Sequence, residues 1–284
     1  MQAVVITGVS TGIGHAAAKV MIAHGYKVFG SVRKEADAQR VKAELGENFT
    51  PLIFDVVDPK GISDAADIVR DALKGHTLAG LVNNAGIAVS GPLLEVPESE
   101  YRKQLEVNLV GPFLVTQAFA PLLGADPQLT GAPGRIVNIS SVAGLRAMPF
   151  VGPYAASKFG LEGYSEALRR ELMLFGIDVI VIGPGPVKTA IWDKAEEVDI
   201  EQYGSSPYRP ILERFQKVFI SQGRDGYPAD RLGELICTAL TTAKPKVRYA
   251  AVKGRMMEKL MMRVASPRML DNAIAKMLGL KKRS

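Results

Sequence analysis

The chain of 284 residues contains a single cysteine, Cys237, and therefore cannot form an internal disulfide bond. One thiol also excludes a zinc site built from several cysteines, and it is typical of proteins kept in a reducing compartment. Histidine is almost as scarce, because the three histidines, His15, His24 and His76, all lie near the N-terminus. We therefore predict no metal centre in this chain.

Long apolar runs are absent as well. A membrane-spanning helix needs about 18 or more consecutive apolar residues, and the sequence has no such stretch. The opening residues, MQAVVITG, have neither the basic segment nor the small-residue cleavage site of a secretory signal. Hydrophobic residues make up 47% and charged residues 23% of the chain, which excludes a disordered or fibrous protein. These features predict a cytoplasmic globular protein.

The net charge of +6 is unevenly distributed along the chain. Residues 246–284 contain eleven lysines and arginines against two carboxylates, so the preceding residues carry a small negative charge. No basic footprint covers a whole domain, and we therefore expect no nucleic-acid partner. Six of the ten methionines also lie in this tail. A basic, Met-rich helix can contact an anionic membrane, a partner helix or the protein's own body, and the sequence leaves these alternatives open.

Short runs rich in β-branched residues alternate with longer helical patterns. The expected strands are Ala3–Thr7, Lys27–Val32, Thr50–Asp55, Leu78–Asn83, Arg135–Ser140, Asp178–Ile182 and Val247–Val252. The expected helices are Ile13–His24, Gly61–Leu73, Ser99–Leu123, Tyr154–Phe175 and Pro228–Thr242. Runs such as LIFDV and DVIVI are almost wholly apolar, which is typical of parallel strands covered on both faces. We predict one doubly wound α/β domain over residues 1–252 and a helical extension over residues 253–284.

Residues 190–226 interrupt this alternation after the sixth strand and are rich in Glu, Tyr, Pro and Gly. Parallel-sheet enzymes bind ligands at the carboxyl ends of their strands, so we predict a substrate-binding flap here; a surface decoration is the alternative. Trp192, the only tryptophan, is a candidate wall of an apolar substrate pocket.

Three glycines, Gly8, Gly12 and Gly14, lie between the first strand and the first helix. Glycines at such a turn let the backbone approach a pyrophosphate, whose charge is then stabilised by the helix N-terminus. The same segment contains Gly8-Val9-Ser10-Thr11-Gly12, the G-x-S-x-G pattern of α/β-hydrolases. A hydrolase triad needs a histidine after its acid, and the last histidine is His76. The hydrolase alternative is therefore excluded, and a dinucleotide loop is favoured.

The second strand ends in Gly30-Ser31-Val32-Arg33, where an acid would bind the ribose of NAD(H). Arg33 offers instead a planar fork of donors that suits the 2′-phosphate of NADP(H). We predict that NADP(H) is preferred and that NAD(H) remains an alternative, since Glu35 and Asp37 lie close by.

Tyr154 and Lys158 are four residues apart and lie on one face of an expected helix. A free phenol has a pKa of about 10 and is a poor base near neutral pH. A neighbouring ammonium favours the phenolate, so the pair is a candidate general acid/base.

With these motifs the chain resembles the short-chain dehydrogenase/reductase family over about residues 2–252. The matching segments are TGVSTGIG at Thr7–Gly14, Asp55-Val56, Asn83-Asn84-Ala85-Gly86, EVNLVG around Asn108, Ser141 thirteen residues before Tyr154, and Pro184-Gly185-Pro186-Val187-Lys188-Thr189. The resemblance implies a Rossmann-like fold with a seven-stranded parallel sheet in the order 3-2-1-4-5-6-7.

The resemblance also implies roles for individual residues. The implied catalytic residues are Asn108, Ser141, Tyr154 and Lys158, with Ser140 as an adjacent alternative to Ser141. The implied coenzyme-binding residues are Gly8, Ser10, Thr11, Gly12, Ile13, Gly14, Arg33, Asp55, Val56, Asn83, Ala85, Gly86, Tyr154, Lys158, Pro184, Gly185, Val187 and Thr189. Ser141, Tyr154 and Trp192 are expected to meet the substrate.

Within the family, the chain most resembles NADP-type 17β-hydroxysteroid and retinol dehydrogenases. This looser resemblance rests on Phe29–Arg33 and on the extended carboxyl end. We therefore expect an NADP(H)-dependent oxidoreductase that interconverts a ketone or aldehyde and an alcohol, with a bulky apolar substrate. The alternatives are a reductase of small or carrier-linked keto groups and a non-enzymatic NADP(H)-binding sensor or docking protein. The family also implies a homodimer or homotetramer. The basic tail makes peripheral contact with a membrane an open alternative.

Overall fold

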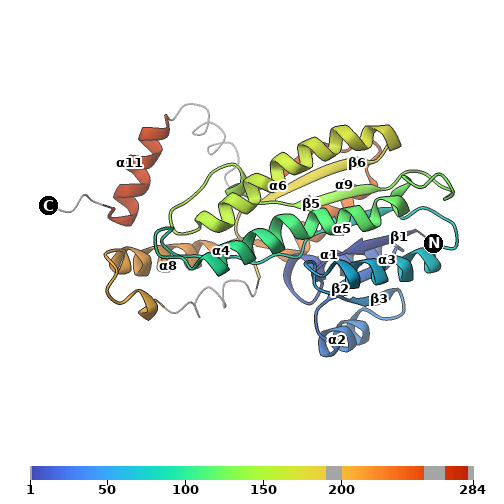
Figure 1. Ribbon diagram of the computed structural model, residues 1–284, viewed down its shortest axis with the longest axis horizontal. Coiled ribbons are helices and arrows are strands. Elements are labelled where there is room, and N and C mark those ends of the chain that lie inside the picture. The colour runs from blue at the N-terminus through green and yellow to red at the C-terminus, as the bar shows by residue number, and fades with distance from the viewer. Residues whose placement is uncertain (1, 190–199, 253–265, 281–284) are drawn as a thin grey trace.

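Seven parallel strands form the larger sheet in the described part of the chain (Figure 1). The computed structural model describes residues 2–189, 200–252 and 266–280. The strands of this sheet are β1 (Ala3–Ile6), β2 (Lys27–Val32), β3 (Phe49–Ile53), β4 (Gly80–Asn83), β5 (Arg135–Ile139), β6 (Asp178–Pro184) and β9 (Arg248–Ala251). Their order, β3-β2-β1-β4-β5-β6-β9, confirms the predicted topology, with β9 as the seventh strand.

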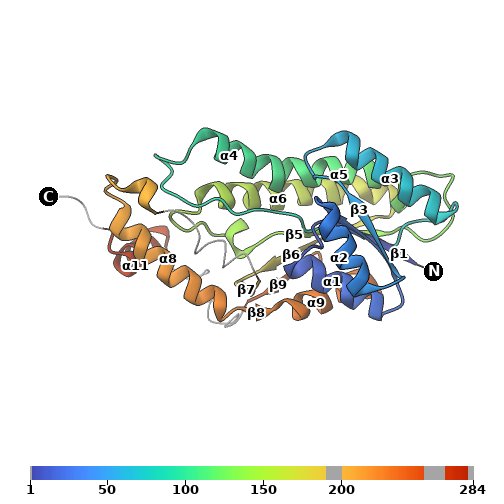
Figure 2. The ribbon, with the colours of Figure 1, turned by 90° about the horizontal axis from the view of Figure 1, so that it is seen from below.

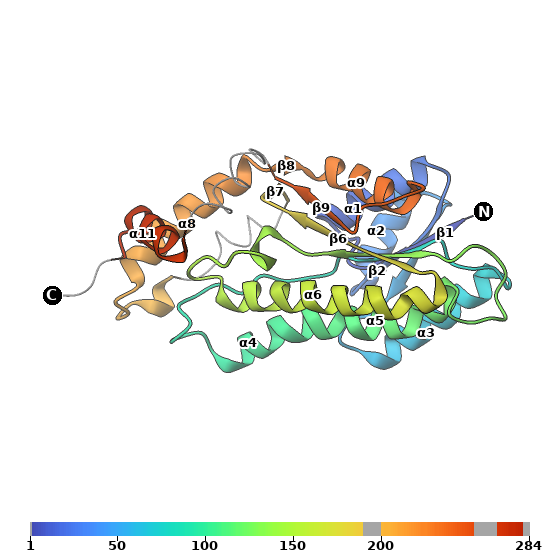
Figure 3. The same cartoon turned by 90° about the horizontal axis from the view of Figure 1, so that it is seen from above.

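The central strands are buried on both faces because helices cover the sheet from two sides (Figure 3), whereas the edge strands β3 and β9 are only partly buried. One side carries α1 (Gly12–Ala23), α2 (Glu35–Leu45) and α9 (Ala229–Thr241), and the other carries α3 (Pro59–Leu73), α5 (Gly111–Phe119) and α6 (Gly152–Glu171). Along β1, Val4 and Ile6 belong to the first apolar core, whereas Ala3 and Val5 belong to the second. An almost wholly apolar strand sequence is thus explained by two separate cores.

The chain reverses direction across the sheet between β1 and β4. β1 pairs with β2 on one side and with β4 on the other, so that Val4 lies opposite both Val28 and Gly80. A crevice opens at such a reversal, at the carboxyl ends of the strands, and ligands of doubly wound folds bind there. The segments that follow β1, β4, β5 and β6 all meet at this edge.

Three helical features differ from the sequence-based expectations. The predicted helix Ser99–Leu123 is wrong as one regular helix, because α4 (Glu98–Leu105) passes through a π-helical turn, η1 (Glu106–Val110), before α5 begins. Helix α2 was not predicted, and only Ala38 and Val41 of it are buried, so its apolar stripe is too short to stand out. Helix α8 (Arg209–Arg224) occupies much of the predicted flap.

Helices α8 and α11 (Pro267–Leu278) lie together beyond the carboxyl ends of the strands, at the end of the molecule opposite the N-terminus (Figure 2). They share a third apolar cluster, whose fully buried member Leu278 ends α11. A two-stranded pairing of β7 (Val187–Lys188) with β8 (Tyr227–Pro228) connects this region to the body. Among the described helices, none combines the length and the apolar character needed to cross a membrane.

Candidate active site

The glycine-rich segment after β1 is a tight backbone cradle. Gly8 and Gly12 have positive φ angles of 71° and 64°, which disfavour any other residue there. A side chain at Gly14 would collide with the carbonyl oxygen of Gly8. The segment is fixed from outside: Ser31 Oγ accepts from the amide of Gly8 at 3.0 Å, and Arg40 donates to the carbonyl oxygen of Ser10 at 2.8 Å.

The N-terminus of α1 faces this cradle and has no side-chain cap among the described residues. Thr11, the N-cap residue, makes no side-chain capping bond, and the first turn carries no acid. The first amides of a helix need acceptors, and the helix dipole favours an anion there. A cradle that only glycine can form, leading into an uncapped helix, fits the pyrophosphate of a dinucleotide. Ser10, Thr11 and Ile13 lie within this segment, as expected for coenzyme contacts.

Arg33 and Asp55 lie at the carboxyl ends of β2 and β3, where the adenosine half of a dinucleotide would bind. Arg33 is 68% exposed, and its guanidinium lies 3.9 Å from the Asp55 carboxylate. Such an exposed pair is weak, so the guanidinium is available to a stronger anionic partner. Val56, the next predicted contact, is buried beside Gly111.

The Asn83–Gly86 segment after β4 forms hydrogen bonds both to neighbouring elements of the sheet and to the glycine-rich segment. Asn83 donates to Asn138 at 2.9 Å and to Thr116 at 3.1 Å, so its side chain joins β5 to the helix α5 that covers the sheet. Asn84, absent from the predicted site residues, donates to the carbonyl oxygens of Thr7 and Gly8 at 2.8 and 3.0 Å. The amide of Ala85 donates to Thr7 Oγ1 at 3.0 Å. The predicted coenzyme segment is thus bonded directly to the glycine-rich one.

Asn108 lies in the π-helical turn and is 1% exposed. Its side chain accepts from the amide of Ile87 at 2.9 Å and donates to the carbonyl oxygen of the same residue at 3.0 Å. Gln104, one turn earlier, binds the same segment by accepting from the amide of Val89 at 2.6 Å and donating to Ile87. Ser157 connects these side-chain amides to α6, since it lies 3.3 Å from Asn108 and donates to the carbonyl oxygen of Tyr154.

Tyr154, Ser141 and Lys158 come together as the resemblance implied. Burial raises the pKa of the Tyr154 phenol, and a hydrogen bond with Ser141 opposes that rise. Lys158 Nζ lies 5.7 Å from the centre of the Tyr154 ring and donates to the carbonyl oxygen of Ile139 at 2.8 Å. Burial lowers the pKa of Lys158 to about 8, and the Glu162 carboxylate opposes that fall.

Ser141 is distinguished from its neighbour Ser140 by these contacts. Ser141 caps the short helix η3 (Val142–Gly144) by accepting from the amide of Ala143 at 3.1 Å, and it bonds to Tyr154. Ser140 Oγ is buried and has no hydrogen-bond partner among the described residues. The geometry therefore favours Ser141 as the serine that meets the reacting oxygen.

The segment from Pro184 to Thr189 closes the crevice on the side of β6. The amide of Gly185 donates to the carbonyl oxygen of Ala251 at 2.9 Å, and Val187 is buried in β7. A side chain at Gly12 would lie 3.3 Å from Thr189, so the two predicted coenzyme segments face each other. Trp192 lies outside the described residues.

This arrangement has a proton donor, a cation and a dinucleotide cradle at one edge of the sheet. The described residues hold no cluster of three or more His, Cys, Asp and Glu side chains that suits a metal ion. A phenol beside an ammonium can pass a proton to or from an alcohol or carbonyl oxygen. The site is therefore suited to an exchange of hydride with a dinucleotide and of a proton with Tyr154.

The sequence profile of the short chain dehydrogenase family matches residues 2–199. The chain belongs to this family of NAD(P)-dependent oxidoreductases. It is 37% identical to the NADPH-dependent 3-dehydrocapnine reductase of Ornithobacterium rhinotracheale, over 97% of both chains. It is 32% identical to mouse retinol dehydrogenase 16, over 87% of this chain and 80% of that protein.

Solved structures agree with this assignment. A short chain dehydrogenase/reductase of Burkholderia phymatum in complex with NAD has a TM-score of 0.76 at 25% identity, with 92% of each chain covered. A short-chain dehydrogenase of Streptomyces avermitilis has a TM-score of 0.73 at 26% identity, covering 99% of this chain and 98% of that one. These structures share the doubly wound fold, and the chain acts on a small-molecule alcohol or carbonyl compound with a nicotinamide coenzyme.

Proposed function

We propose that the protein is an NADP(H)-dependent reductase of a bulky apolar ketone or aldehyde. The observation that carries this proposal is the third apolar cluster, formed by buried Phe150, Val151, Tyr203, Leu212, Phe215 and Leu278, against which Tyr154 packs. Partly buried apolar side chains, among them Met148, Ile211 and Phe219, pack against this cluster. An apolar surface of this kind with polar groups at one end binds an apolar substrate and orients its polar atom. The carbonyl oxygen would then meet Ser141 and Tyr154.

Four side chains divide the proposed chemistry. Ser141 donates a hydrogen bond to the carbonyl oxygen, and Tyr154 gives it a proton. Lys158, as an ammonium, stabilises the phenolate that remains. Asn108 fixes the segment after β4 and supports a water path for returning the proton. A nicotinamide bound in the cradle would supply the hydride.

A preference for NADP(H) is supported by the charges around the adenosine end. Arg33 is exposed at the carboxyl end of β2, and a 2′-phosphate is a stronger partner for it than the carboxylate of Asp55. Arg40 adds a second guanidinium beside Ser10, although Asp37 and Glu44 offset its charge. The Ornithobacterium relative is named as NADPH-dependent. NAD(H) remains the alternative coenzyme.

The proposal is tested by NADPH oxidation over carbonyl compounds graded from small ketones to steroid-sized ones. We expect kcat/KM to rise with apolar bulk, and Tyr154→Phe to lower kcat by at least about 100-fold, because the proton donor is lost. The control is unchanged NADPH binding and thermal stability in the variant. Turnover confined to small or carrier-linked keto compounds would contradict the bulky substrate, and binding without any turnover would favour a sensor.

We further propose a homodimer or homotetramer that pairs through α5 and α6. Phe113 and Phe159 are 42% and 47% exposed on these helices, and Phe113 packs edge-on against Tyr164. Exposed aromatic side chains on neighbouring helices are typical of a protein interface.

The tail is the proposed site of any membrane contact, because Met269 and Met277 of α11 are exposed beside Arg268 and Lys276.

A further inference from the structure

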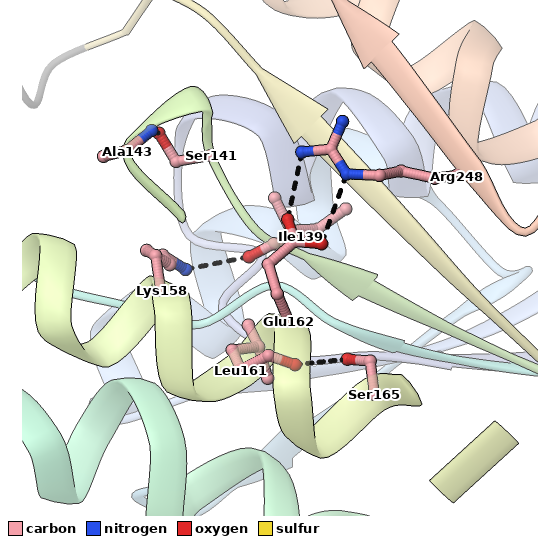
Figure 4. Close-up of polar contacts among 8 residues, drawn as sticks. All are labelled: Ile139, Ser141, Ala143, Lys158, Leu161, Glu162, Ser165 and Arg248. Carbon is pink, nitrogen blue, oxygen red and sulfur yellow. Dashed lines mark hydrogen bonds and ion pairs between the residues drawn. The ribbon is translucent and has the colours of Figure 1, made fainter. Parts of the chain in front are cut away.

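A partly buried ion pair lies one helical turn beyond the catalytic lysine (Figure 4). Glu162 follows Lys158 by four residues on α6, and Arg248 extends towards it from β9. Arg248 Nη2 lies 3.0 Å from Glu162 Oε1 and Arg248 Nε lies 3.2 Å from Oε2, so the contact is bidentate. The two side chains are only 26% and 16% exposed. The proposed reaction gives neither residue a role.

Two glycines make room for this pair. A side chain at Gly183 of β6 would collide with the Arg248 guanidinium, which therefore lies directly over the strand. A side chain at Gly144, in the short helix capped by Ser141, would lie 3.1 Å from Glu162 and 2.8 Å from Ser140 Oγ. The pair thus fills a space between α6, β6, β9 and the serine segment, which consists of residues 140–144.

We propose that Glu162 and Arg248 are a positioning pair that tunes the charge of Lys158 and holds the serine segment in register with the catalytic helix. This inference rests on the proposed function, in which Lys158 acts as an ammonium beside Tyr154. Desolvation alone would drive Lys158 towards its neutral form. A carboxylate one turn away favours the ammonium, and the guanidinium limits this effect because it neutralises part of that charge.

Among the described residues, Glu162 is the one charged group that acts on the pKa of Lys158. β5 presents the carbonyl oxygen of Ile139 to Lys158, whereas the amides of Gln104 on α4 and Asn108 on η1 contact the neighbouring Ser157. Gly144, between the serines and α6, lies next to the carbonyl oxygen of Lys158. Besides Glu162 and Arg248, the titratable group at this level is the Tyr154 phenol. Glu162 is accordingly the charge that raises the pKa of Lys158 against desolvation.

The test is the pH profile of kcat for variants of both partners, with a carbonyl compound that the wild-type enzyme reduces. Glu162→Gln keeps the shape but removes the negative charge, so Lys158 loses its proton earlier and the alkaline limb moves to lower pH. Arg248→Met leaves the carboxylate without its neutralising partner, so the alkaline limb moves to higher pH. If the pair tunes the pKa of Lys158, the two variants shift the alkaline limb in opposite directions. A mere loss of packing lowers kcat but leaves the pH of the alkaline limb unchanged.

Three comparisons complete the design. Arg248→Lys retains the charge and is expected to restore the wild-type profile. Glu166→Gln breaks the exposed Glu166–Arg170 pair on the same helix and is the matched control, with no shift expected. An NMR titration of ¹³C-labelled lysine, assigned with a Lys158→Arg variant, follows Lys158 directly and needs no substrate.

The outcomes separate this proposal from the proposed function. Shifts of the same sign in Glu162→Gln and Arg248→Met, or a Lys158 titration that neither variant changes, would overturn the positioning pair. Absence of wild-type turnover would overturn the proposed function alone, since the NMR titration still reports on the pair. Where one of the two variants does not fold, the other still tests the proposal, because each has its own expected direction: a lower Lys158 pKa in Glu162→Gln and a higher one in Arg248→Met.

Discussion

Burial acts on the two central side chains of the site in opposite senses. It raises the pKa of the Tyr154 phenol and lowers that of the Lys158 ammonium, so that both are pushed towards their neutral forms. The protonated phenol is the form that a carbonyl reduction needs, whereas the neutral amine is not. Keeping Lys158 charged therefore destabilises the folded state, because the ammonium is buried away from water.

Replacement of Lys158 by methionine is expected to stabilise the fold. The folded pKa of about 8 lies below the ordinary value of 10.5, so the charged lysine destabilises the folded state fully below pH 8. Between pH 8 and 10.5 the penalty shrinks, and above that range it is gone. We expect Lys158→Met to raise the free energy of unfolding at pH 7 by about 1–3 kcal/mol, less the lost bond to Ile139.

Urea denaturation at several pH values measures this effect, and the gain should diminish as the pH approaches 10. Lys103→Met removes an exposed lysine on α4 and should change stability little at any pH. A Lys158→Met protein that is less stable than the wild type at pH 7 would contradict the argument.

Arg33 provides the residue-scale test of coenzyme choice. Arg33→Ala is expected to raise the Kd of NADPH by about tenfold or more, which corresponds to about 1.4 kcal/mol, because a charge-assisted bond to the 2′-phosphate is lost. The Kd of NADH should change much less. Fluorescence titration with both coenzymes measures this, and Arg70→Ala, which breaks a remote pair with Asp126, is the control. Equal changes for the two coenzymes would contradict the phosphate assignment.

Some site residues could be predicted from the sequence and others could not. Tyr154 and Lys158 lie one helical turn apart, so their spacing alone placed them together. Asn84 lies in the quoted Asn83-Asn84-Ala85-Gly86 motif but was given no role, and Gln104 was missed, because each acts through bonds to the main chain of a segment far along the sequence, or across a loop. Ser31 belongs to the same class, since it binds the amide of Gly8 from the neighbouring strand. No pattern of neighbouring residues in the sequence predicts such contacts.

At the scale of elements, a hydrogen bond between described residues joins α8 to α11 beyond the carboxyl ends of the strands. Arg214 of α8 donates from Nη1 to the carbonyl oxygen of Leu278 at 3.2 Å, at the C-terminus of α11. The last carbonyl groups of a helix lack partners within the helix, and a cation stabilises them. The bond therefore holds α11 against the apolar cluster that contains Leu278 and packs on Tyr154.

We expect Arg214→Met to raise KM for bulky carbonyl compounds several-fold while KM for small ketones stays nearly constant, because only the larger substrates reach the cluster. Steady-state kinetics over the graded series measures the difference. Lys217→Met, one turn further along α8, is the control and should leave both values unchanged. An equal rise for small and bulky substrates would show that the bond supports the whole site instead.

The elements themselves were predictable in proportion to how they are buried. The central strands lie between two cores and have nearly continuous apolar sequences, so they were located to within a few residues. The edge strand β9 is only partly buried but was located equally well. Helix α2 buries only two side chains, and α8 packs with aromatic residues against a small cluster. Their sequences therefore resemble those of surface segments.

At the scale of the whole molecule, the exposed aromatic face of α5 and α6 sets the expected assembly. Phe159→Glu places a charge on this face and is expected to shift the protein towards a monomer, since a buried carboxylate without a partner is costly. Light scattering after size-exclusion chromatography measures the mass. Met173→Glu, at an exposed position beyond the end of α6, is the control. A wild-type protein that is monomeric at micromolar concentration would refute the proposed interface.

The π-helical turn between α4 and α5 lets one helical segment bond both to strand β4 and to the loop that follows it. Gln104, Asn108 and Thr116 all bond to residues of β4 or of the segment that continues it. In a regular α-helix Gln104 and Thr116 would diverge by about 120°, at about 100° per residue. One wide turn removes about 100° of rotation and brings the three side chains into phase. Removing one residue from Glu106–Val110 would regularise the helix and force it to release either the sheet or the active-site segment.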